Sequence, residues 1–119
     1  MARAGRVSAV VVFVTAPSAA VGATLAKALI SKHVAACVNI LPGVRSWFWW
    51  EGHVDQAREV LLVIKTLKSR LAELQKLILT IHPYQVPEII ALPIPEGHRP
   101  YLDWIASSVR HSAEKIAQS

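Results

Sequence analysis

The chain has 119 residues, of which 53% are apolar and only 18% are charged. This composition excludes a disordered chain, and the length predicts a single domain over residues 1–119. The net charge of +5 permits acidic partners, but the basic residues are scattered, which argues against a nucleic-acid-binding stripe.

The N-terminal part of the chain predicts a buried strand followed by a helix. Residues 8–15 form a continuous Val/Phe run, as expected of a central strand that is covered on both faces. The same run, preceded by two arginines, also fits a signal peptide. We favour the strand, because a helical pattern follows Pro17 at once, from the candidate N-cap Ser18 to about Lys32.

Two extended segments, residues 34–48 and 54–66, predict a long β-hairpin with a turn at Glu51-Gly52. Pro42-Gly43 predicts a bulge or bend in the first of these strands. The middle of the second strand, residues 60–64, is apolar without alternation, which predicts that both of its faces are buried. One sheet face of a two-layer domain normally meets water, so we expect another subunit to cover it.

The C-terminal half predicts a helix, a short strand and a last helix. The first helix ends before Pro83, a strand follows over residues 88–94, and Pro100 opens the last helix. The order βαββαβ with an extra C-terminal helix predicts an α+β, ferredoxin-like sandwich. The two helices carry apolar stripes at Leu67, Leu71, Leu74, Ile78 and Ile81, and at Leu102, Ile105, Val109 and Ile116.

His82 and Cys37 are the candidate metal ligands that the residues themselves suggest. His82 lies where a helix breaks, so its imidazole either binds a metal or caps the last helical carbonyls. Cys37 lies in an apolar strand, where a thiol is usually a small buried hydrophobe, and a reactive or metal-binding thiol is the alternative. The five histidines lack the spacing of a complete single-chain site, which leaves open a site shared between subunits.

Four large aromatic residues at the hairpin turn, Trp47, Phe48, Trp49 and Trp50, predict a binding surface. Such rings anchor protein interfaces or stack on nucleic-acid bases. We favour a protein interface, because the aromatic and basic sheet signature of RNA-recognition domains is missing. Glu59 and Lys65 lie on one face of the second hairpin strand, either as a solvated rim or as the wall of a cleft.

Eight short motifs, in order over most of residues 8–109, resemble the CutA divalent-cation-tolerance proteins. The resemblance implies a ferredoxin-like protomer in a tight homotrimer, with the hairpin strands paired across subunits, as in PII-type signal proteins. It also implies a role in copper and divalent-metal tolerance without catalysis. The motifs are Thr15-Ala-Pro17, Ala35-Ala-Cys-Val-Asn-Ile40, Trp50-Glu-Gly52, Glu59 to Lys65-Thr66, His82-Pro-Tyr84, Pro87-Glu-Ile89, Leu92-Pro93-Ile94 and Tyr101-Leu-x-Trp104.

The resemblance and the strand pattern together assign expected roles to individual residues. We expect a divalent ion, Cu²⁺ or Zn²⁺, that folding does not require, bound by His82 with Cys37 or Glu88. The expected ligand-cleft residues are Trp50, Glu59, Lys65 and Tyr84, and the expected trimer-interface residues are Trp47, Phe48, Trp49, Leu62 and Ile64.

The expected function is therefore divalent-metal (copper) tolerance or response by a homotrimer that binds or regulates and is not an enzyme. The alternative is a PII-like small-ligand sensor, or a protein-binding scaffold, that uses the inter-subunit cleft. An enzyme with His82 and Glu88 as acid and base ranks last, because two titratable groups do not make a mechanism. We expect no nucleic-acid partner and no membrane insertion. A cytoplasmic protein is favoured, and organelle or secretory routing of a longer precursor stays open.

Overall fold

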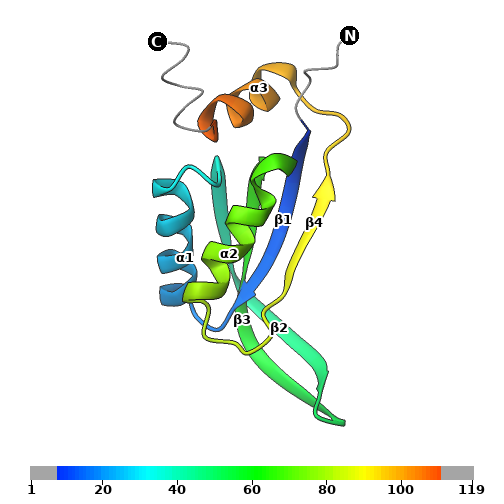
Figure 1. Ribbon diagram of the computed structural model, residues 1–119. Coiled ribbons are helices and arrows are strands. Elements are labelled where there is room, and N and C mark those ends of the chain that lie inside the picture. The colour runs from blue at the N-terminus through cyan, green and yellow to red at the C-terminus, as the bar shows by residue number, and fades with distance from the viewer. Residues whose placement is uncertain (1–7, 111–119) are drawn as a thin grey trace.

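The computed structural model describes residues 8–110. These residues form one antiparallel sheet with α1 and α2 side by side across one face and α3 at one end (Figure 1). The strands are β1 (Ala9–Ala16), β2 (Cys37–Trp50), β3 (His53–Leu67) and β4 (Ile89–Pro93). The helices are α1 (Ala19–Ser31), the 3₁₀ turn η1 (Lys68–Arg70), α2 (Leu71–Ile81) and α3 (Arg99–Ser108).

The strand order β2-β3-β1-β4, with every neighbouring pair antiparallel, confirms the predicted α+β, ferredoxin-like fold. β1 is a central strand, because Val12 pairs with Ile64 of β3 on one side and with Ala91 of β4 on the other. The strand interpretation of this segment is therefore confirmed. The predicted N-cap is also present, since the backbone N–H of Val21 donates to Ser18 Oγ at 3.2 Å.

The start of α2 differs from the prediction. Leu67 fits the helical stripe by spacing, but it is the last residue of β3 and pairs with Ala9. Its side chain is buried against Ile105 and Val109 in a second, smaller core beneath α3. Tertiary packing therefore places Leu67 in the strand, and η1 links the strand to α2.

The main core lies between the sheet and the helices α1 and α2. Alternate residues of the central strands point into it. Leu62 and Ile64 are fully buried there, within their own chain. The expectation that these two side chains form a subunit interface was wrong, because strand alternation turns Leu61 and Val63 to the opposite face instead. The helix residues that share this core include Leu25, Leu29, Leu74 and Ile78.

The opposite face of the sheet is apolar and largely uncovered in the described chain. We call it the open face. Phe13 lies at its centre between Val63 of β3 and Ile90 of β4, and Ile90 is 53% exposed. Within residues 8–110, α3 packs on this face at one end, through contacts that reach Ala9. Other apolar side chains of the open face include Val11, Leu41, Leu61 and Leu92.

The predicted bulge at Pro42-Gly43 is present and changes which face of β2 carries which residues. The β2–β3 register shifts between Leu41 and Val44, and Gly43 has φ 78°, a conformation that favours glycine. Before the bulge, Leu41 pairs with Leu61 on the open face. After it, Arg45, Trp47 and Trp49 lie on the helix side of the ladder, and Val44, Ser46, Phe48 and Trp50 on the open side.

α3 begins with Pro100 in its first turn, as predicted, and buries Ile105. Val109 follows the end of the helix and is also buried, whereas the predicted contribution of Ile116 lies outside the described residues. None of the helices described between residues 8 and 110 has the length and hydropathy needed to cross a membrane.

Candidate functional site

His82 is the C-cap residue of α2, and it connects this helix to the C-terminal end of β1. Its backbone N–H donates to the carbonyl of Ile78, which completes the helix, and Pro83 prevents a further turn. The imidazole does not cap the helix. Nε2 lies 2.7 Å from the carbonyl oxygen of Thr15, and Nδ1 lies 3.2 Å from the backbone N–H of Tyr84. Because a carbonyl only accepts and an N–H only donates, the ring is neutral with its proton on Nε2.

Tyr84 and Glu59 form the second part of the site. The Tyr84 hydroxyl donates to Glu59 Oε2 at 2.6 Å, and the tyrosine ring lies 4.7 Å from the His82 ring, centroid to centroid. Burial raises the pKa of Tyr84, and the hydrogen bond and negative charge of Glu59 raise it further. Glu59 is only 8% exposed, so it is a buried carboxylate and not the solvated rim that one sequence interpretation offered.

Thr15 connects His82 to Glu88. Its carbonyl takes the His82 hydrogen bond, and its hydroxyl lies 3.5 Å from Glu88 Oε1. Glu88 is exposed and directly precedes β4, so most of its carboxylate lone pairs face solvent. We use the name His82 cluster for the set His82, Tyr84, Glu59, Glu88 and Thr15.

Cys37 and Lys65 lie in a separate group on the open face. They are paired across β2 and β3, and both the Lys65 ammonium and the Cys37 thiol donate to Asn39 Oδ1, the thiol at 3.6 Å. Tyr101 of α3 lies close by, and its pKa is raised by burial first and by Cys37 second. We call Cys37, Asn39, Lys65 and Tyr101 the Cys37 cluster.

The two clusters lie at different levels of the sheet. Lys65 pairs with Val11 of β1, whereas Leu61 pairs with Thr15, four residues further along that strand. At about 3.3 Å per residue, that separation is roughly 13 Å. One chain therefore does not bring Cys37 to His82 and Glu88.

The expected ligand-cleft residues also divide. Glu59 and Tyr84 touch, but Lys65 lies six residues from Glu59 along β3 and belongs to the Cys37 cluster. Trp50 pairs with His53 at the hairpin turn, six residues along β2 from Val44, the partner of Glu59. Both separations are roughly 20 Å along a strand. A cleft that contains all four residues needs more than one chain.

The described residues of a single chain do not contain a complete set of donors for a divalent metal. Among residues 8–110, no three or more His, Cys, Asp or Glu side chains are grouped so as to hold a metal ion. Glu88 offers free oxygens, but both ring nitrogens of His82 are engaged. Coordination through Nδ1 would replace the hydrogen bond from the Tyr84 N–H, and tetrahedral sites need three or four donors. The described residues of one chain therefore do not form a complete metal site.

We expect Tyr84→Phe to lower the free energy of unfolding by about 1–3 kcal/mol, because Glu59 Oε2 loses its donor in a buried position. Equilibrium urea unfolding at neutral pH measures this change. Tyr101→Phe is the matched control, since it removes a tyrosine hydroxyl elsewhere in the chain. A loss of the same size in Tyr101→Phe, or none in Tyr84→Phe, would contradict the assigned role of the Tyr84–Glu59 bond.

The pH dependence of stability provides a second readout on Tyr84. The folded state raises its pKa above the ordinary 10.0, so above that pH the folded chain keeps a proton that the unfolded chain has lost. The free energy of unfolding is therefore unaffected below about pH 10 and falls as the pH rises further. Tyr84→Phe should flatten this alkaline decline, and an unchanged or steeper decline would refute the assignment.

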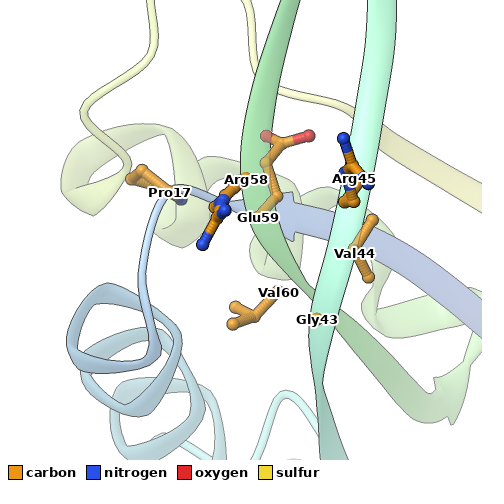
Figure 2. A pocket seen from close by; sticks show the side chains of 7 residues that line it. All are labelled: Pro17, Gly43, Val44, Arg45, Arg58, Glu59 and Val60. Atoms are coloured by element: carbon orange, nitrogen blue, oxygen red, sulfur yellow. The ribbon is translucent and has the colours of Figure 1, made fainter.

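A pocket of about 470 Å³ adjoins the His82 cluster where the hairpin leaves the body of the sheet (Figure 2). Two arginines that sequence reasoning did not single out, Arg45 and Arg58, line it together with Glu59. Thr15 belongs to one of the family motifs but was not expected in the site, because it contacts His82 through its backbone carbonyl, which no side-chain pattern reveals. The remaining lining residues are Pro17, Gly43, Val44 and Val60.

The CutA1 divalent ion tolerance protein family model matches residues 10–108 of the chain. The chain belongs to this family. A divalent-cation tolerance protein CutA from Thermus thermophilus is 50% identical over 95 residues, which cover 80% of this chain and 92% of that protein. The human Protein CutA is 41% identical over 97% of this chain, which spans 61% of the human protein.

Solved structures of CutA1 proteins share the fold. The crystal structure of CutA1 from Oryza sativa has a TM-score of 0.86 and 48% identity, and covers 89% of this chain and 97% of that one. The structure of the Thermus thermophilus protein has a TM-score of 0.84 and 46% identity, and covers 86% of this chain and 99% of that one. The family resemblance inferred from the short motifs is thus confirmed over nearly all of the described residues.

Proposed function

We propose that this CutA-family chain acts in divalent-cation tolerance, with copper as the principal metal, by binding or regulation and not by catalysis. Membership of the CutA1 divalent ion tolerance family over residues 10–108 is the observation that carries the proposal. We further propose that the protein works in the cytoplasm. The plant relatives whose names include "chloroplastic" extend well beyond the matched region, which is consistent with routing of longer precursors.

A homotrimer is the assembly that we propose. The support is the open face, a contiguous apolar surface built around Phe13 and Val63 that α3 covers only at one end. Exposed apolar surface of this kind marks interaction sites. The hairpin residues Trp47, Phe48 and Trp49 are exposed in the single chain and are proposed to contribute, with Leu61 and Val63 in the place of Leu62 and Ile64.

We propose that a divalent ion binds where donors of two subunits meet. Glu88 and, through Nδ1, His82 are the donors of one chain, and Cys37 of a neighbouring chain is the third. The support for a shared site is the separation of roughly 13 Å between the two clusters within a chain. A borderline ion such as Cu²⁺ or Zn²⁺ suits a donor set of imidazole, carboxylate and thiolate.

Calorimetric titration of metal-stripped protein with Cu²⁺ and Zn²⁺ tests the metal proposal. Saturable binding is expected at a stoichiometry tied to the trimer, weakened at least tenfold in His82→Ala and in Glu88→Gln. Glu88 is exposed, so its variant keeps the fold even where loss of His82 disturbs it. His98→Ala, at an exposed histidine before α3, should bind like the wild type. No saturable binding, or equal weakening in His98→Ala, would defeat the proposal.

The second candidate is a PII-like sensor that binds a small ligand in the inter-subunit cleft, or a scaffold that binds a protein there. The observation that favours it is that the buried Glu59, which accepts the Tyr84 hydroxyl, lines a pocket. For such a sensor, some metabolite should raise the melting temperature of the wild-type protein. The same metabolite should leave the melting temperature of Lys65→Ala unchanged. The absence of any shift across a broad metabolite panel would count against it.

A further inference from the structure

We propose that Arg45 and Arg58 form a binding site for small oxyanions, meaning the phosphate or carboxylate group of a small molecule. The site is separate from the proposed metal donors, and the proposal stands whether or not the chain binds a metal. It rests on three observations: the register of the hairpin, the lack of an ion-pair partner for either arginine among the described residues, and the pocket that both arginines line.

The bulge at Pro42-Gly43 places the two arginines together. Without the register shift after Leu41, Arg45 would lie on the open side of the ladder. With the shift, Arg45 and Arg58 are direct cross-strand partners and share one face. Directly opposed residues of an antiparallel pair have Cβ atoms about 5 Å apart, and like charges at such positions destabilise the sheet.

Nothing in the described part of the chain neutralises this pair. The ion pairs found there are Arg70 with Glu73 and Arg99 with Asp103. Glu59 lines the same pocket and is the nearest acid in sequence, but it accepts the Tyr84 hydroxyl and is in neither of these ion pairs. Neither guanidinium group therefore has an ion-pair partner among the described residues.

The surroundings suit a bound anion. The pocket of about 470 Å³ is of ligand size, and Pro17, Gly43 and Val60 supply apolar walls beside the arginines (Figure 2). The Arg45 guanidinium lies 5.3 Å from the centre of the Trp47 ring, a cation–π contact that holds it in place while its N–H donors stay free. Two neighbouring guanidinium groups present pairs of N–H donors, which suit the oxygens of phosphate and carboxylate groups.

The charge of the chain favours an outside ligand over a second copy. The chain has 13 basic and 8 acidic residues, so another copy brings net positive charge to a site that is already positive. Among the acids of residues 8–110, Glu59 is hydrogen-bonded to Tyr84, and Glu73 and Asp103 are ion-paired within the chain. Glu51, Asp55, Glu88 and Glu96 are exposed, so a second copy is the competing occupant that the mass of Arg45→Gln tests. A small oxyanion removes the repulsion between the arginines, whereas a basic protein surface increases it.

Isothermal titration of the metal-stripped protein with pyrophosphate, and separately with citrate, tests the site and distinguishes a phosphoryl from a carboxylate ligand. We expect saturable binding of at least one probe to the wild type, and at least tenfold weaker binding in Arg45→Gln and in Arg58→Gln. Arg99→Gln is the matched control, because Arg99 is an exposed arginine of α3 outside the pocket. It should bind like the wild type.

Three results would overturn the proposal. They are the absence of saturable binding of either probe, equal weakening in Arg99→Gln, which indicates unspecific attraction to a basic protein, and dissociation of the assembly in Arg45→Gln, which assigns the pair to a subunit contact. Thermal melting checks the fold of the variants. Removing one of two opposed like charges should leave the melting temperature of the ligand-free protein equal or higher.

Discussion

Val63→Asp is expected to convert the assembly into single chains at micromolar concentration. Val63 lies on the open face between Phe13 of β1 and Asn39 of β2, at the centre of the proposed subunit contact. An aspartate there places a carboxylate in an apolar interface without a partner, which costs several kcal/mol for each ion. Size-exclusion chromatography with light scattering measures the mass, and circular dichroism checks that the chain still folds.

Leu79→Asp is the matched control for this variant. Leu79 is an apolar residue of α2 that is 52% exposed, and it lies in the helix layer, away from the open face. The same change of charge there should leave the mass of the assembly unaltered. If Val63→Asp retains the wild-type mass, or if Leu79→Asp loses it, the open face is not the assembly surface.

Leu62→Ala is expected to lower the free energy of unfolding by about 2–5 kcal/mol, although it is the direct neighbour of Val63. Leu62 points to the other side of β3 and is fully buried. It packs beside Gly22 of α1, where an added Cβ would lie 3.5 Å from Leu62 Cδ1. The truncation leaves a cavity between sheet and helices that the close packing cannot refill. Urea unfolding at fixed protein concentration measures the loss.

Leu79→Ala shows whether this cost is specific to burial. It removes the same atoms from a half-exposed helix position, so its effect should stay within about 0.5 kcal/mol. Equal losses in the two variants would mean that Leu62 is not a core residue. We expect Leu62→Ala to lose stability without dissociating, and Val63→Asp to dissociate. This pair of results would show that one face of β3 forms the core and the other face forms the subunit contact.

Most of the fold followed from local patterns in the sequence. Val/Phe runs, a Ser18 cap, the Pro42-Gly43 bulge and the Pro83 stop each act through neighbouring residues, and the structure has all four. The direction of the hairpin side chains could not be predicted in the same way. A continuous apolar run such as residues 60–64 gives no sign of which alternate residues face the helices, so Leu62 and Leu61 could not be told apart.

The candidate site was predictable only in part, because it depends on contacts between distant segments. His82, Tyr84 and Glu88 stand close together in the sequence; His82 contacts Tyr84 directly, and Glu88 is linked to His82 through Thr15. The bond of the His82 ring to the Thr15 carbonyl and the pairing of Arg45 with Arg58 arise from strand register. Register also separates Cys37 and Lys65 from the His82 cluster, which a sequence-level grouping of motif residues does not show.

The mass of the wild-type protein in solution is the most direct test of the central claim, that the open face is an assembly surface on which a shared site is completed. Sedimentation equilibrium of metal-stripped protein at micromolar concentration measures it without a label. The proposed homotrimer requires a mass three times that of the 13.0 kDa chain. A species of 13.0 kDa would contradict both the trimer and the shared metal site, because residues 8–110 of one chain contain no complete group of metal donors.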